Sequence, residues 1–170
     1  DKLVHINRVA KVVKGGKSLV ASRGSIMLKG TKFILKTPVS TIWFDGKTQW
    51  NYIYKNQEVN ISHPTATELQ NMNPYYILSM YQKGFNYKLG TSKSGGQEII
   101  LMAQNSKSTI THISLIITSK DTPKSITITR RDGSRTILNV SGYQAGADFS
   151  DLMFAFNKKK YPKVEVVDLR

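Results

Sequence analysis

The 170-residue chain contains no cysteine. This absence excludes disulfide bridges, a cysteine nucleophile, and zinc or iron–sulfur sites built on thiolates. Apolar residues never run for the ~18 positions that a membrane-spanning helix needs. No signal peptide is present and the sequence begins at Asp1, so we expect a processed product whose leader has been removed.

Sequence motifs for catalysis are missing as well. The triplet 16–18 ends like a phosphate-binding P-loop, but Lys11 stands where that loop needs its first glycine. No Gly-x-Ser-x-Gly elbow is present for a serine nucleophile. The histidines lack the i, i+4 pairing of a helical metal site, and they are His5, His63 and His112. We therefore expect no enzyme activity, no metal and no cofactor.

Acidic residues are scarce, 11 against 25 Lys and Arg, which leaves a net charge of +14. A pI near 10 raises the question of nucleic-acid binding. The densest basic stretches are 130–135 and 158–160, whereas the aromatic residues gather at 43–54. Because single-strand binders place aromatics between their cations, we expect no specific nucleic-acid binding. The charge then serves either as a solvated surface or as a basic docking face.

Period-two alternation of apolar and polar residues dominates the chain and indicates strands. Turn signals separate these runs at short spacing, for example Asp132-Gly133, where we expect a type I′ hairpin turn. This pattern predicts one large antiparallel sheet, either a sandwich or a full or partial barrel. The first residues also suit a helix, but the Gly-Gly turn that follows favours a strand. The expected strands are 4–13, 18–29, 42–44, 49–54, 97–102, 113–117, 125–131 and 134–140.

One segment, 64–84, departs from the strand pattern. Thr65 and Glu68 have the spacing of a capping box, which predicts a short helix through Met72. Asn73-Pro74 then predicts a second helix to Lys83, with Gly84 as its left-handed end. Little of that helix is polar, so it either packs on the sheet as ordinary core or lies against another apolar surface.

Two stretches of the sequence carry a family likeness. The first is 24–30 with Phe33, Pro38 and the run Trp-Phe-Asp-Gly-Lys-Thr-Gln-Trp at 43–50. The second is Phe154-Ala-Phe156 with the terminal run 161–170. Together they resemble the periplasmic outer-membrane lipoprotein carrier family (LolA type), in its Bacteroidetes branch. The resemblance extends from about residue 20 to the end, and further matches in order are 58–59, Ile61, 64–65, 68–69 and 73–74.

The resemblance implies an α+β, mostly β fold: an open antiparallel half-barrel, or incomplete β-barrel, with short helices covering its concave face. Residues 1–170 would form a single lipoprotein-carrier domain, with 64–84 as a helical lid insertion. It also implies a monomeric, non-catalytic carrier in the periplasm. Such a carrier shields the acyl chains of lipoproteins or related lipids and delivers them to the outer membrane. Its implied partners are an inner-membrane release complex and an outer-membrane acceptor.

The sequence departs from the family at two places. Proteobacterial members carry an Arg-Pro pair after the position of Lys29, and that arginine ties the lid to the barrel. Gly30 stands there in this chain, so we expect a lid without that latch. Members also begin with an amphipathic helix, whereas this chain begins at or near its first strand.

A carrier of this kind needs adaptable apolar walls, because each methylene of a lipid left in water costs about 0.8 kcal/mol. We expect the cavity floor to come from sheet positions of one parity: Ile26, Leu28, Phe33, Leu35, Trp50, Tyr52, Leu101, Ile113, Leu115 and Ile128. The lid would add Leu69, Met72, Ile77, Met80 and Tyr81. The same residues also suit a filled core. In that case the protein would be a β-rich interaction or sensor module with a basic docking face.

Overall fold

The structure is a computed structural model that describes residues 2–12, 18–72, 84–93, 95–146 and 148–170. The chain divides into two compact units. The first unit comprises Asp1–Val4, Gly24–Ser79 and Gln144–Arg170, and the second comprises His5–Arg23 and Met80–Tyr143. The single domain expected from the sequence stays a prediction. Within the described residues, no helix has the length and apolar character to cross a membrane.

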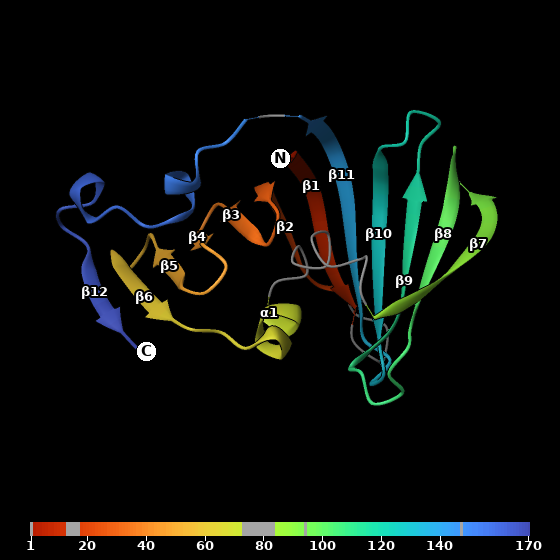
Figure 1. Ribbon diagram of the computed structural model, residues 1–170, viewed down its shortest axis with the longest axis horizontal. Helices are drawn as coiled ribbons and strands as arrows, with labels where there is room; N and C mark the ends of the chain where they lie inside the picture. Colours follow the sequence, from red (N-terminus) through yellow and green to blue (C-terminus); the bar gives the residue numbers. More distant parts are fainter. Residues whose placement is uncertain (1, 13–17, 73–83, 94, 147) are drawn as a thin grey trace. The chain divides into compact units, whose positions relative to one another are not determined.

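The first unit is built on a sheet with the strand order β12-β6-β5-β4-β3-β2 (Figure 1). Its pairs from β2 to β6 are antiparallel, as expected, but β12 runs parallel to β6. The expectation of a purely antiparallel sheet is therefore wrong here, because a long connection rather than a hairpin leads into β12. The strands are β2 (Ser18–Lys29, its second half), β3 (Lys32–Lys36), β4 (Ser40–Phe44), β5 (Gln49–Ile53), β6 (Glu58–Ser62) and β12 (Glu165–Asp168).

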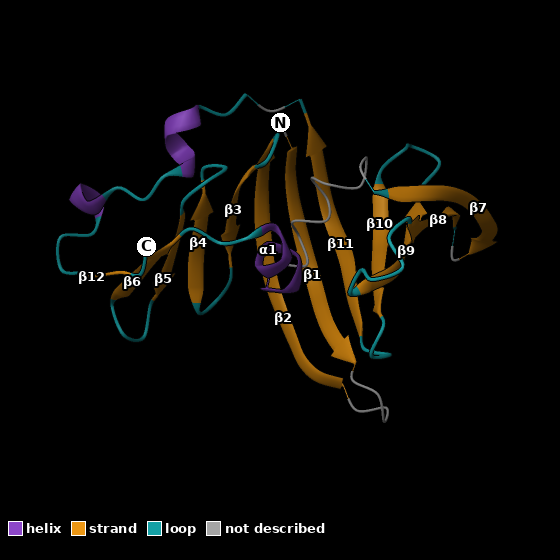
Figure 2. Cartoon of the chain, turned by 60° about the horizontal axis from the view of Figure 1, so that its bottom comes forward, coloured by secondary structure: helices purple, strands orange, loops and turns teal. Residues whose placement is uncertain are grey.

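The second unit has the strand order β1-β11-β10-β9-β8-β7, and the first half of β2 also belongs to it (Figure 2). The pairs from β11 to β7 are antiparallel. Residues 2–12 form a strand and not a helix, as expected. These strands are β1 (Lys2–Val12), β7 (Phe85–Lys93), β8 (Gly96–Ala103), β9 (Ile110–Ile117), β10 (Pro123–Arg130) and β11 (Arg135–Ala145). The prediction of a mostly β protein is confirmed.

The only α-helix of the described residues, α1 (Ala66–Met72), begins with the expected capping box. The Thr65 backbone N–H donates to Glu68 Oε2 at 2.7 Å, and the Glu68 N–H donates to Thr65 Oγ1 at 3.2 Å. The hydrogen bonds that Glu68 accepts from Thr65, the backbone one first, lower the pKa of Glu68 below its usual value. The expected second helix, 73–83, lies outside the described residues. Gly84 has the left-handed φ of +82° that we expected for it.

The β10–β11 hairpin differs from the expected type I′ turn. That turn requires a positive φ at both central residues, but only Gly133 has one, at +81°. The loop is instead four residues long, 131–134, and the Gly133 N–H donates to the Arg130 carbonyl at 3.0 Å. The Ser134 N–H donates to Asp132 Oδ1 at 2.8 Å. The side chain of Asp132 thus accepts a backbone hydrogen bond within the loop, and the chain reverses with a single left-handed residue, Gly133.

This geometry predicts how position 133 responds to substitution. A left-handed conformation costs an L-residue roughly 1–2 kcal/mol, and asparagine tolerates it better than alanine. We expect Gly133→Ala to lower the free energy of unfolding by about 1 kcal/mol and Gly133→Asn to lower it less, as measured by urea denaturation. Equal losses for the two variants would contradict the assigned turn.

Candidate functional site

The sheet of the first unit is apolar on both faces. Directly paired residues of neighbouring strands share a face. The pairs Ile26–Leu35, Leu28–Phe33 and Phe33–Phe44 therefore define one face, here named the isoleucine face. The pairs Met27–Ile34, Ile34–Trp43 and Trp43–Trp50 define the other, the tryptophan face. The side chains of the isoleucine face are buried, and they are Ile26, Leu28, Phe33, Leu35 and Phe44.

The sheet residues expected to line one cavity floor are divided between these two faces. Ile26, Leu28, Phe33 and Leu35 lie on the isoleucine face, as one parity requires. Trp50 and Tyr52 lie on the tryptophan face instead, because Trp50 pairs with Trp43 and Tyr52 is two residues further along β5. The turns that join β2 to β5 fix the pairing, so odd and even positions exchange faces from strand to strand.

The C-terminal segment, residues 148–164, covers the tryptophan face. Phe154 is fully buried in a cluster with Ile34 and Trp43. Phe156 and Tyr161 pack on the same cluster, with ring centroids 5.5 Å from Trp43 for Phe156 and 5.2 Å from Tyr52 for Tyr161. Each such aromatic pair contributes about 0.5–1.5 kcal/mol beyond its buried area. The segment contains two short 3-10 helices, η2 (Asp151–Phe154) and η3 (Lys158–Lys160).

Ionic contacts hold the start of the C-terminal segment. Asp151 Oδ1 lies 3.1 Å from the Nζ of Lys32 and 3.4 Å from that of Lys29. Lys29 Nζ also donates to the Phe149 carbonyl at 2.5 Å. The hydrogen bond from Lys32, followed by the charge of Lys29, holds the pKa of Asp151 below its ordinary value. Gly30, where the resemblance implied a missing latch, lies in the adjacent turn with a φ of +57°.

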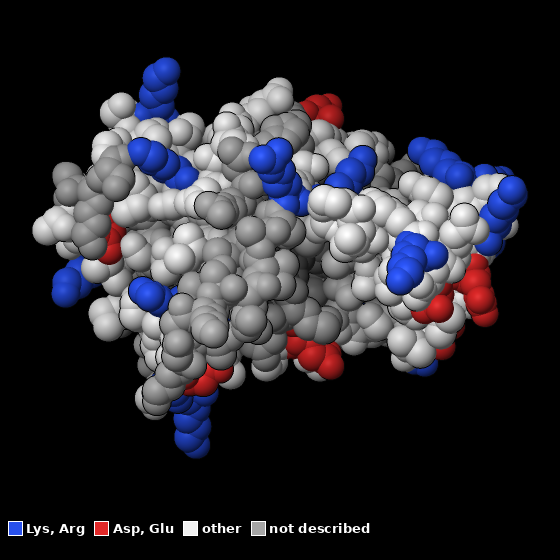
Figure 3. Space-filling view, turned by 180° about the vertical axis from the view of Figure 1, so that it is seen from behind, with Lys and Arg blue, Asp and Glu red and all other residues white. Residues whose placement is uncertain are grey.

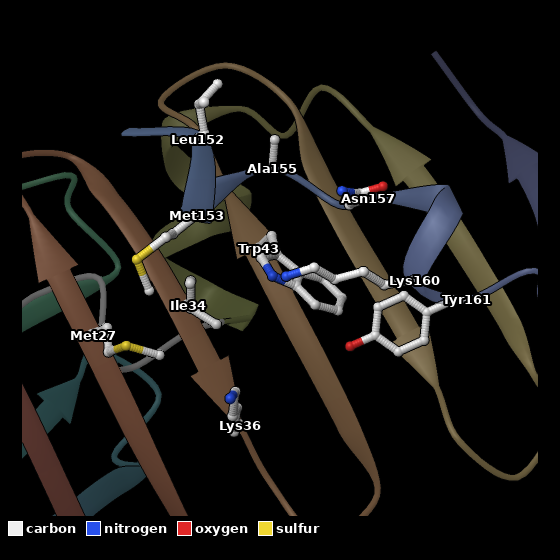
Figure 4. A pocket seen from close by; sticks show the side chains of 10 residues that line it. All are labelled: Met27, Ile34, Lys36, Trp43, Leu152, Met153, Ala155, Asn157, Lys160 and Tyr161. Carbon is white, nitrogen blue, oxygen red and sulfur yellow. The ribbon is translucent and has the colours of Figure 1, made fainter. Parts of the chain in front are cut away.

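A pocket of about 210 Å³ lies between the tryptophan face and the C-terminal segment (Figure 4). Its sheet side is formed by β2, β3 and β4, and its other side by η2, η3 and their connection. No pattern in the sequence predicts this pocket. It is lined by Met27, Ile34, Lys36, Trp43, Leu152, Met153, Ala155, Asn157, Lys160 and Tyr161.

The second unit has an apolar face of its own, here named the aliphatic face. The pairs Leu101–Ile113 and Ile113–Ile128 place three of the expected residues on it. Leu115, the fourth, joins them through its pairs with Ile99 and Ile126. Its fully buried members are Leu101, Ile113, Ile126, Ile128 and Leu138. These four expected residues of the second unit thus share one face.

The aliphatic face becomes accessible at β7. Tyr87 pairs with Leu101 and Leu89 pairs with Ile99, so both belong to this face. Their exposed fractions are 61% for Tyr87 and 74% for Leu89. The opposite face of β8 is different, because it carries the buried Glu98, whose Oε1 accepts a 2.9 Å bond from Ser114 Oγ.

The expected lid residues are described only in part. Leu69, on α1, is buried. Ile77, Met80 and Tyr81 lie outside the described residues, and so does the side chain of Met72. Across the part of the chain that the structure describes, no three His, Asp or Glu side chains gather as a metal site would require. What the described residues offer is apolar surface and scattered positive charge.

Comparisons with known proteins identify the family. The family model described as outer membrane lipoprotein carrier protein LolA matches residues 7–134. The chain belongs to the LolA family. No match is found among curated proteins. The Bacteroidetes branch stays a prediction.

Several solved structures are similar to this LolA-family chain at low sequence identity. An uncharacterized conserved protein from Thermus thermophilus has a TM-score of 0.55 and 14% identity, with 98% of this chain and 89% of that one covered. A LolA superfamily protein from Nitrosomonas europaea has a TM-score of 0.45, 11% identity, and coverages of 91% and 90%. A putative outer membrane lipoprotein-sorting protein domain from Vibrio parahaemolyticus has a TM-score of 0.46, 10% identity, and coverages of 95% and 91%.

The ionic contacts of Asp151 predict a pH-dependent attachment of the C-terminal segment. The pKa of Asp151 is lowered in the folded protein, so its ionised carboxylate stabilises the attached segment. This stabilisation is fully present above the ordinary carboxyl pKa of about 3.9 and is lost as the pH falls through the lowered value. We expect Asp151→Asn to speed amide hydrogen exchange across 148–156 at neutral pH. In the parent protein, we expect acidification to lower the protection of the same amides, measured relative to their intrinsic exchange rate at each pH.

The matched control is Asp148→Asn, which removes a neighbouring exposed carboxylate of the same segment. Exchange should stay at the parent rate in this variant. Equal acceleration in both variants would mean that the net charge of the segment, and not the contact with Lys29 and Lys32, determines its attachment.

Proposed function

We propose that this LolA-family protein is a periplasmic carrier that shields the acyl chains of lipoproteins, or of related lipids, and delivers them to the outer membrane. The family match supports this proposal most directly. In it, the sheet forms an open half-barrel with short helices over its concave face, and 64–84 acts as the lid. The carrier works as a monomer without catalysis. It receives cargo from an inner-membrane release complex and gives it to an outer-membrane acceptor.

The apolar faces supply the physical chemistry that such a carrier needs. Each methylene group of an acyl chain that is exposed to water costs about 0.8 kcal/mol of free energy. A carrier recovers this free energy by burying the chain in non-directional apolar contacts. Isoleucine, leucine and phenylalanine side chains provide such contacts on the isoleucine and aliphatic faces. We propose that acyl chains bind there, against Ile26, Leu28, Phe33 and Leu35 in the first unit and Leu101, Ile113, Leu115 and Ile128 in the second. The lid would contact the chains through Leu69, Met72, Ile77, Met80 and Tyr81. We also propose Trp50 and Tyr52 as cavity residues, on the sequence pattern alone.

One observation favours the alternative function, an interaction or sensor module with a filled core. Five side chains of the aliphatic face are fully buried, as in an ordinary core: Leu101, Ile113, Ile126, Ile128 and Leu138. The basic docking face of that alternative has less support. In the described parts of the face that Figure 3 shows, Lys and Arg side chains are spread over several places, and Asp and Glu side chains also lie on this face.

Displacement of a hydrophobic fluorescent probe distinguishes the two functions. A carrier should bind the probe in its folded state and release it when a triacylated lipopeptide is added, whereas the same peptide without acyl chains should have no effect. A protein with a filled core should bind neither the probe nor the lipopeptide. Probe binding that is absent below the aggregation threshold would contradict the carrier function.

A pair of exposed residues then tests the proposed face. Leu89 lies on the aliphatic face at β7, and Met102, which is 47% exposed, lies on the opposite face of the neighbouring strand β8. Because both side chains reach solvent, neither Leu89→Asp nor Met102→Asp should change the free energy of unfolding by more than about 0.5 kcal/mol. We expect Leu89→Asp to weaken lipopeptide binding at least fivefold and Met102→Asp to leave it unchanged. Equal effects would remove the aliphatic face from the proposal.

A further inference from the structure

The pocket beneath the C-terminal segment has no role in the function proposed above. Its sheet residues Met27, Ile34 and Trp43 belong to the tryptophan face, opposite the isoleucine face proposed for acyl chains. All of its lining residues lie in the first unit and are described. The pocket is therefore a second site, whose ligand can be inferred from its own chemistry.

The interior of the pocket is apolar. Ile34 and Trp43 are buried at its base, and Met27 is half-buried beside them. Ala155, in the connection after η2, is a further apolar lining residue. At about 210 Å³, the pocket is smaller than the ~300–1,000 Å³ of sites for drug-sized ligands. This size suits one short aliphatic chain and not the several long chains of a lipoprotein.

The rim of the pocket carries positive charge. Lys36 and Lys160 are both exposed lining residues, and in Figure 4 the Lys160 side chain extends toward Trp43 while Lys36 stands apart from it on β3. Within the described part of the chain, neither forms an ion pair with a carboxylate. Tyr161 adds a phenol whose pKa is raised, first by burial and then by Tyr54 and Tyr52, so it stays protonated and able to donate.

More apolar surface continues outside the pocket. Leu152 is 87% exposed and Met153 is partly exposed, although both line the pocket. An apolar side chain of this size in water is normal when it stands alone, but here two adjacent ones border a cavity. They extend the apolar path from the interior toward solvent.

We propose that this pocket binds a single-chain anionic amphiphile, with its short apolar tail on Ile34 and Trp43 and its carboxylate or phosphate head between Lys36 and Lys160. The tail displaces water from the apolar base, and the head stays at the rim, where the two ammonium groups and solvent meet it. A neutral chain of the same length binds less well, because it displaces water from the apolar base but lacks the charge that attracts the two ammonium groups.

Tryptophan fluorescence tests the proposal directly, because the chain has only two tryptophans. Trp43 lines the pocket and Trp50 does not. The probe is decanoate with a bromine atom at the end of its chain, which quenches only nearby indoles. In the Trp50→Phe variant, where Trp43 is the reporter, we expect saturable quenching below the micelle concentration. In the Trp43→Phe variant we expect at least threefold less quenching, because the tail loses its contact with the Trp43 indole and the remaining reporter, Trp50, lies beside the pocket and does not line it.

Charge variants test the head group. Exposed ion pairs contribute roughly 0.2–1 kcal/mol each, so Lys36→Gln with Lys160→Gln should weaken bromodecanoate binding about two- to thirtyfold. The control is Lys47→Gln with Lys120→Gln, which changes the net charge equally at exposed positions that do not line the pocket. The control should bind as the parent does. Bromodecanol should bind weakly to all of them, and bromodecyl phosphate should follow the carboxylate.

Three results of the quenching experiments with bromodecanoate alone would overturn the proposal. One is the absence of saturable quenching, and another is equal quenching of the two reporters. The third is equal weakening in both pairs of lysine variants, which would indicate a general effect of charge. A triacylated lipopeptide should not displace bromodecanoate from the Trp50→Phe protein. If the lipopeptide displaced bromodecanoate, the pocket would not be a separate site and this proposal would be wrong. If the protein bound bromodecanoate but no lipopeptide, only the proposed carrier function would be contradicted.

Discussion

The first unit depends on one constraint: its sheet is apolar on both faces, so both faces must be kept from water. Three strands carry apolar residues at consecutive positions, at 26–28, 33–35 and 42–44. Consecutive residues of a strand point to opposite faces, so each run supplies both. Leaving a side chain such as Trp43 uncovered would cost roughly 1.5–3 kcal/mol, a large part of the stability of a small domain. The C-terminal segment meets this requirement on the tryptophan face.

The path of the C-terminal segment follows from that role. It has little regular structure of its own, so its position depends on anchors at its two ends. Asp151 holds its start to Lys29 and Lys32, and β12 holds its end by pairing with β6. Hydrogen bonds from the Glu165 N–H to the Gln57 carbonyl and from the Leu169 N–H to the Ile61 carbonyl bound this pairing. Between the anchors, the rings of Phe154, Phe156 and Tyr161 pack on the tryptophan face, and the pocket lies beside them.

Sequence reasoning predicted the local features and missed those that depend on how strands are paired. The capping box of Thr65 and Glu68 and the strand at 2–12 follow from neighbouring residues alone, and both are confirmed. The faces of Trp50 and Tyr52 depend on every turn between β2 and β5, and the parallel β12 depends on a distant pairing. A usable signal was present, because apolar triplets in successive strands are typical of a sheet covered on both sides.

The C-terminal segment and the proposed lid differ in what would be needed to displace them, and a carrier requires such a difference. Uncovering the tryptophan face means breaking ion pairs, a strand pairing and an aromatic cluster together. The described part of the proposed lid, α1, is a seven-residue helix, and helices this short are marginal by themselves. Its N-terminus is stabilised by Thr65 and Glu68, and its buried Leu69 supplies apolar contact. A helix that is marginal by itself can move at small cost, which suits the cover of a releasable cargo. The anchored C-terminal segment suits a face that stays closed while the cargo is exchanged.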